Sequence, residues 1–177
     1  MKFNLILSTS RNRESDAVNE FIKLIQENLE ESPLVEISDI RGIILALSET
    51  DPLEVIDLFK NMVTEEPWHF RYLLRVIPVQ MVCSTNLTEI VVGSCNLFKK
   101  VSEVSSFKIL VEKRFCSIKS REVVSAIASR ITNKVDLDCP DWIVLVEILG
   151  NKTGISVLRP EHLLSIVKQK IDGHRNK

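Results

Sequence analysis

The stretch between residues 107 and 160 constrains the fold of this chain more than any other. At its centre lies the almost unbroken apolar run WIVLVEIL, at 142–149. Such a run is typical of a β-strand that is covered on both faces. Around this central strand the pattern predicts a strand at 107–113, a helix at 120–131, a tight turn at 150–154 and a strand at 155–158. We therefore expect a buried sheet that carries a helix on one side.

Basic residues gather in the same stretch. Residues 106–134 contain seven basic side chains and two acidic ones. The basic ones are Lys108, Lys113, Arg114, Lys119, Arg121, Arg130 and Lys134. We expect Ser120 to cap the helix that begins among them, and the N–H groups and positive dipole end of a helix N-terminus favour bound phosphate. The alternative interpretation is a solvated basic surface without a ligand.

The net charge differs in sign between the two parts of the chain. The net charge is −1, but residues 1–66 hold 6 basic and 14 acidic residues, a net charge of −8. Residues 67–177 hold 17 basic and 10 acidic residues, a net charge of +7. This division favours two modules, of which the second binds a polyanion.

The first part of the chain alternates between strand and helix patterns. Strands are predicted at 3–8, 34–40, 43–47 and 72–79, and helices at 16–29 and 52–65. The second helix begins with the strong signal Asp51-Pro52. The order β-α-β-β-α-β is that of a ferredoxin-like unit. We place this unit at residues 1–80 and a second domain at residues 81–177.

Several classes of function are excluded by what the sequence lacks. It has no apolar run of about 18 residues, so we expect no membrane span, and its start does not resemble a secretory signal. The four cysteines are too far apart for a zinc site, so we expect no metal and free thiols in the reducing cytoplasm. Neither a GxxxxGK[ST] nor a GxGxxG loop is present, so we expect no cofactor.

Glu147 interrupts the central apolar run and needs a partner if it is buried. A catalytic role would require a second acid, a histidine or a metal beside it. We expect an ion pair with Arg114 or Arg130 instead.

Five segments of the chain resemble a known family. They are LLRVIPV at 73–79, FKILVEKR at 107–114, SREVV at 120–124, KVDLDCPDWIVLVEI at 134–148 and GISVL at 154–158. Together they resemble the THUMP domain, an RNA-binding domain of tRNA thiouridine synthases, RNA methylases and pseudouridine synthases. The preceding unit resembles the ferredoxin-like domain that accompanies it. The resemblance implies an α+β fold, in which a ferredoxin-like βαββαβ unit is followed by a THUMP domain with a mixed sheet.

The arrangement is similar to that of stand-alone THUMP proteins that assist tRNA cytidine acetylation. This resemblance implies a non-catalytic adaptor, which holds tRNA near its acceptor stem and 3′ end for a separate N4-acetylcytidine acetyltransferase. The positions that match the family, and from which we expect RNA contacts, are Arg75, Lys113, Arg114, Arg121 and Lys134. Charge and placement add Lys108, Lys119 and Arg159.

Three alternatives stay open on the sequence. The chain could be the RNA-binding component of another tRNA-modifying system, for thiolation or methylation. It could itself modify RNA, although no acid–base constellation or cofactor loop supports this reading. It could also be a protein–protein scaffold without a role in RNA binding.

Overall fold

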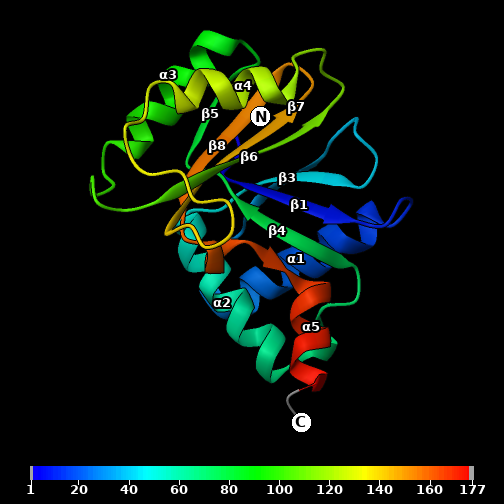
Figure 1. The fold of residues 1–177 in the computed structure, drawn as a ribbon. Helices are drawn as coiled ribbons and strands as arrows, with labels where there is room; N and C mark the ends of the chain where they lie inside the picture. The colour runs from blue at the N-terminus through cyan, green and yellow to red at the C-terminus, as the bar shows by residue number, and fades with distance from the viewer. Residues whose placement is uncertain (1, 176–177) are drawn as a thin grey trace. The chain divides into compact units, whose positions relative to one another are not determined.

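The computed structural model describes residues 2–175, and their side chains as far as residue 172. The chain divides into two units (Figure 1). The first unit combines the residues up to Pro78 with those from Glu161 onward, and the second unit is Val79–Pro160. Among the residues described, no helix has the length and apolar character needed to cross a membrane.

The first unit is an antiparallel sheet with helices on one face. Its elements are β1 (Leu5–Thr9), α1 (Glu14–Leu29), β2 (Leu34–Ile37), β3 (Ile43–Leu47), α2 (Pro52–Glu65), the short 3-10 helix η1 (Pro67–His69) and β4 (Leu73–Pro78), followed much later in the chain by β9 (Leu164–Ser165) and α5 (Ile166–Arg175). The strands lie in the order β2-β3-β1-β4-β9. Up to β4, the strands and α-helices follow the order that the sequence predicted, β-α-β-β-α-β. The Asp51 side chain accepts a hydrogen bond from the Leu53 N–H at 2.8 Å, which explains where α2 begins.

The C-terminal segment belongs to the first unit. Its strand β9 pairs with β4, with Ser165 opposite Arg75. The Gln169 side chain of α5 donates hydrogen bonds to the Lys60 carbonyl at 3.1 Å and to Thr64 Oγ1 at 3.0 Å, both on α2. The predicted domain boundary at residue 80 places this segment in the second domain, whereas the structure places it in the first unit. The structure has the 3-10 helix η2 (Pro160–His162) and β9 before α5.

The second unit is a mixed sheet under two helices. Its elements are β5 (Met81–Ser84), α3 (Leu87–Phe98), β6 (Phe107–Arg114), α4 (Ser120–Ala128), β7 (Trp142–Leu149) and β8 (Lys152–Leu158). The strand order is β5-β8-β7-β6, and β6 runs parallel to β7 while the other neighbours are antiparallel. Strands β5, β6 and β7 therefore run in one direction, and their carboxyl ends lie at the same edge of the sheet.

The core of the second unit lies between this sheet and helices α3 and α4. The side chains of Val144, Val146 and Ile148 project from β7 and pack with Ile90 of α3 and Ile127 of α4. Every residue of β7 after Trp142 is buried, which confirms the prediction of a strand that is covered on both faces. This core fixes where β6 ends and α4 begins, and so positions the basic residues around that junction.

The two units differ in charge, but less than the division at residue 66 suggested. Residues 79–160 hold 11 basic and 8 acidic residues, a net charge of +3. The first unit holds 12 basic and 16 acidic residues, a net charge of −4. The asymmetry is smaller because two basic segments, residues 67–78 and 161–177, belong to the acidic unit, and each contributes a net charge of +2. A polyanion site must therefore depend on local clustering of charge in the second unit.

Candidate nucleic-acid interface

Five basic side chains come from the edge of the second sheet where β6 ends. We name them the basic edge: Lys113, Arg114, Lys119, Arg121 and Lys152. Lys152 begins β8 opposite Leu149, and Leu149 in turn pairs with Arg114. The Gly150 N–H donates to the Arg114 carbonyl at 2.9 Å. The turn between β7 and β8 therefore lies beside the end of β6.

The loop that leads from β6 into α4 is held by local contacts. Lys113 Nζ donates to the Ile118 carbonyl at 2.9 Å, and the Ile118 N–H donates to Cys116 Sγ at 3.3 Å. Phe115 has a positive φ of 54° and its side chain is 81% exposed. A bulky residue in the left-handed region is unusual, and the surrounding contacts must hold it there. The result is an ordered loop that presents an aromatic ring to solvent beside lysine side chains.

Helix α4 begins without a side-chain cap. Lys119 is the N-cap residue and Ser120 the first helical residue, so the predicted Ser120 cap is wrong. Among the described residues, no side chain accepts a hydrogen bond from this first turn. The N-terminus of α3 lies at the same edge but is filled, because Asn86 Oδ1 accepts from the Thr88 N–H at 2.9 Å. Of these two helix starts at the edge, that of α4 is the one that combines N–H groups without a side-chain acceptor with nearby basic residues, Lys119 and Arg121.

A shallow depression of about 410 Å³ lies at this edge. It is lined by the loop after β6, by the turn after β7 and by Thr85. The Thr85 N–H donates to the Asn151 carbonyl at 3.0 Å, and Thr85 Oγ1 lies 3.0 Å from Thr153 Oγ1. The surface of the depression offers hydroxyl, amide and backbone groups. It is open to solvent and suits part of a polymer better than an enclosed small molecule.

The Arg114 side chain forms ion pairs with two carboxylates of this chain. Its Nη1 lies 3.1 Å from Glu147 Oε2, and its Nη2 lies 3.7 Å from Glu112 Oε2. The predicted ion pair of Glu147 is therefore confirmed, with Arg114 rather than Arg130 as the partner. Much of the charge of Arg114 is neutralised by these carboxylates. Its main effect at the basic edge is to fix the end of β6.

The eight predicted RNA-binding residues do not form one surface. Lys113, Arg114, Lys119 and Arg121 lie together at the basic edge, whereas Lys108, Lys134 and Arg159 lie at the opposite end of β6 and β7. Strand β6 is eight residues long, so its two ends are about 23 Å apart. Arg75 belongs to β4 of the first unit.

The second group of basic residues has its own structural contacts. The Lys134 carbonyl accepts a hydrogen bond from the Phe107 N–H at 2.9 Å, at the start of β6. The Arg159 guanidinium lies over the Trp142 ring, 4.3 Å from its centroid. This cation–π contact accounts for the position of Arg159 without an RNA ligand.

Sequence reasoning missed two residues of the candidate site. Lys152 lies in the turn that the sequence predicted, but its place at the sheet edge where β6 ends depends on the strand order. Phe115 is not among the residues from which the sequence predicts RNA contacts. Its exposure and positive φ had no signal in the sequence, because phenylalanine usually lies in the core.

Comparisons with known proteins agree with this fold. Residues 85–158 match the model of the THUMP domain. A protein of Drosophila melanogaster, described as a THUMP domain-containing protein 1 homolog, is 29% identical over 96 residues, which are 50% of this chain and 30% of that protein. The chain therefore spans less than a third of that relative.

Solved structures share the fold of most of the chain. A Pyrococcus horikoshii protein, PH1313, has a TM-score of 0.62 at 16% identity, covering 88% of this chain and 54% of that chain. TrmN from Thermus thermophilus has a TM-score of 0.61 at 15% identity, covering 89% and 46%. A 4-thiouridine synthetase, solved with RNA and ATP, has a TM-score of 0.57 at 15% identity, covering 89% and 42%. Residues 85–158, which include the whole basic edge, form a THUMP domain.

Proposed function

We propose that this chain is a non-catalytic, cytoplasmic adaptor that binds tRNA near its acceptor stem and 3′ end and presents it to a separate N4-acetylcytidine acetyltransferase. THUMP domains are RNA-binding modules of tRNA-modifying systems, and residues 85–158 form one. The observation that carries the proposal is the uncapped start of α4, flanked by Lys119 and Arg121. The acetyltransferase partner rests on the sequence resemblance to stand-alone THUMP proteins.

The basic edge is suited to the RNA backbone rather than to base edges. Lysine and arginine side chains and helix N–H groups bind phosphate, and such contacts position RNA without reading its sequence. Double-stranded RNA is recognised mainly through its shape and backbone. The exposed Phe115 beside these residues adds a surface on which an unpaired base can stack. A duplex that ends in a short single strand, as the acceptor stem does, would use both features.

The lining of the depression supports a binding role. It consists of Thr85, Gly150, Asn151 and the segment 115–118, which contribute neither a histidine nor a carboxylate. Cys116 is the strongest nucleophile there, and its Sγ already accepts a hydrogen bond from the Ile118 N–H. A general base would have to come from outside this lining. In the proposal, the acetyltransferase supplies the chemistry.

We also infer that the first unit is a ferredoxin-like domain. Its elements up to β4 follow the order β-α-β-β-α-β, and β1 lies between β3 and β4. The added strand β9 extends the sheet beyond β4.

A second candidate is the RNA-binding component of a thiolation or methylation system. The fold that the chain shares with a 4-thiouridine synthetase and with TrmN supports this second candidate. Nucleoside mass spectrometry of tRNA from cells that lack this protein separates the two candidates. The proposal expects N4-acetylcytidine to disappear and to return when the gene is restored. Loss of a thiolated or methylated nucleoside instead would support the second candidate and contradict the acetylation role.

A catalytic role for the chain itself needs its own experiment. The purified chain is incubated with unmodified tRNA and the common acetyl, methyl and sulfur donors, and the nucleosides are then analysed. The proposal expects no new nucleoside until the acetyltransferase is added. A modified nucleoside formed by the chain alone would overturn the adaptor role.

A further inference from the structure

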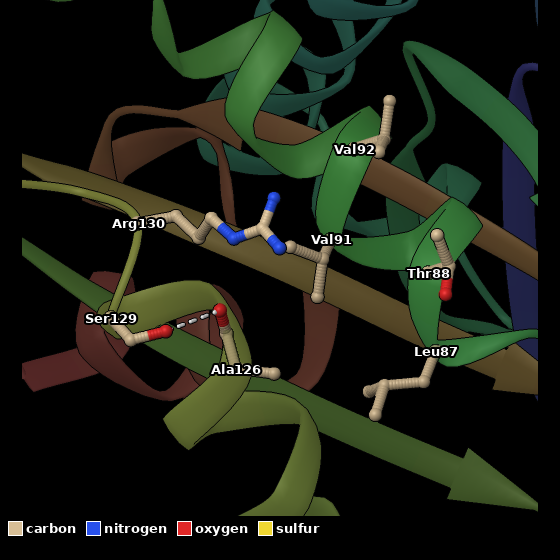
Figure 2. A pocket seen from close by; sticks show the side chains of 7 residues that line it. All are labelled: Leu87, Thr88, Val91, Val92, Ala126, Ser129 and Arg130. Atoms are coloured by element: carbon tan, nitrogen blue, oxygen red, sulfur yellow. Dashed lines mark hydrogen bonds between the residues drawn. The ribbon is translucent and has the colours of Figure 1, made fainter.

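A small groove lies between α3 and α4 in the second unit (Figure 2). The side chains of Leu87, Val91 and Val92 line it from α3, and Ala126 lines it from α4. Its volume is about 190 Å³. Small-molecule sites are usually roughly 300–1,000 Å³, so this groove is too small for a cofactor. It has room for one large apolar side chain of another molecule.

One rim of the groove is positively charged. Arg130 lies just beyond the end of α4, and its side chain extends towards Val91 of α3 (Figure 2). It is the one charged residue in the lining. Within the part of the chain that the structure describes, Arg130 makes no ion pair. A guanidinium beside an apolar groove is complementary to a carboxylate that adjoins an apolar side chain.

The surface around the groove favours association rather than simple solvation. Val92 is 45% exposed although it lies on a helix of the domain core. Burial of such side chains by a partner is favourable, at roughly 25 cal/mol per Å² of apolar surface. The lining contains no aromatic ring on which a base could stack. The lining consists of four aliphatic residues, the hydroxyl-bearing Thr88 and Ser129, and one arginine, and it therefore fits a protein segment better than RNA.

We propose that the groove between α3 and α4 is a docking site for an acidic–apolar segment of a partner protein. A leucine- or phenylalanine-sized side chain of the partner lies between Val91 and Ala126. A neighbouring aspartate or glutamate of the partner pairs with Arg130. This site goes beyond the proposed RNA binding, because none of its residues belongs to the basic edge. An adaptor needs a second surface of this kind to hold its enzyme while tRNA occupies the first.

The test selects short random peptides, displayed on phage, against the full chain. We expect the selected peptides to share an acidic residue close to a large apolar residue. Synthetic versions should lose affinity at least tenfold when Arg130→Glu is introduced. Replacing the acidic residue of the peptide with lysine should restore binding to this variant. Lys100→Glu, the same charge change just after α3 and outside the groove, should leave affinity unchanged.

A second variant tests the apolar part of the site. Ala126→Leu fills the groove without changing charge, and it should also abolish peptide binding while its circular dichroism spectrum stays that of the wild type. An excess of tRNA should not displace the peptide. Enrichment of no common motif, equal affinity for the wild type and Arg130→Glu, or displacement by tRNA would each overturn the proposal. The last result would assign the groove to RNA.

Discussion

Arg114 and Glu147 form an ion pair across the parallel strands β6 and β7, with 3.1 Å between Nη1 and Oε2. The Glu147 side chain is 1% exposed, and that of Arg114 is 28% exposed. A buried carboxylate is costly unless a cation and hydrogen bonds compensate it. The pair therefore joins the end of β6, where the basic edge begins, to the buried central strand.

Removal of Arg114 should destabilise the domain. Breaking a buried pair typically costs about 3–5 kcal/mol, and the partial exposure of Arg114 favours a loss of about 2–4 kcal/mol in Arg114→Ala. Adding Glu147→Gln should recover part of the loss, because an amide is less costly to bury than a charged carboxylate. Urea unfolding of the single and double variants measures both effects. A double variant less stable than the single one would contradict the assigned role.

This pair also decides how RNA binding should be tested. A substitution at Arg114 would change both the surface charge and the fold of the edge. The loop from Phe115 to Lys119 and the first turn of α4 follow directly after it in the chain. Lys119 and Arg121 are exposed and make no ion pair among the described residues, so they report on RNA contacts more directly.

Phe115→Ala should weaken the binding of tRNA by roughly fivefold to tenfold, the lower part of the range for loss of one stacked base. Stability should change little, because the ring is 81% exposed. Filter binding with intact tRNA and with a blunt duplex of the acceptor stem measures the difference. The matched control is Val104→Ala, at an exposed residue of the second unit (93%) that is outside the depression. An equal loss for the blunt duplex would exclude stacking on an unpaired base.

Asp141 should make part of the stability depend on acid pH. Its carboxylate accepts hydrogen bonds from the Ser106 N–H at 2.8 Å and from Ser106 Oγ at 2.9 Å, and these bonds lower its pKa from the ordinary aspartate value. The stabilisation is present above the pKa of the unfolded chain and is lost as the pH falls through the lower folded value. Stability should therefore fall over the acidic range in which the pH drops through and below the ordinary aspartate pKa of about 3.9.

The variant Asp141→Asn should show a smaller fall in unfolding free energy over that range than the wild type. The control is Asp138→Asn, since the Asp138 carboxylate accepts no hydrogen bond among the described residues. Urea unfolding at several pH values gives both results. If Asp141→Asn and the wild type lost the same amount, the hydrogen bonds to Ser106 would not control this dependence.

The sequence predicted the long elements well because their patterns are strong. The apolar run at 142–149 and the Asp51-Pro52 helix start each have one clear structural reading. Strands β5 and β9 were missed because each is short and its position depends on pairing with a distant strand. The return of the C-terminal segment to β4 is a tertiary preference that no local pattern encodes.

The candidate site was predicted in part for a similar reason. Lys113, Lys119 and Arg121 are close in sequence, and the turn from strand to helix keeps them close in space. Lys108 lies at the other end of the same strand, and it was included for its charge rather than for its position along the strand. The uncapped start of α4 also required the structure, since the serine at position 120 suggested a cap.

The most direct test of RNA binding at the basic edge is a salt titration of tRNA affinity for the wild type and for Lys119→Glu/Arg121→Glu. The double variant should bind about 10- to 100-fold more weakly at about 100 mM salt, and its slope of log affinity against log salt should be shallower by about 2, because two phosphate contacts are lost. The control Lys99→Glu/Lys100→Glu makes the same charge change after α3 and should keep the wild-type affinity and slope. If both double variants bound tRNA as the wild type does, the basic edge would not be the RNA-binding surface.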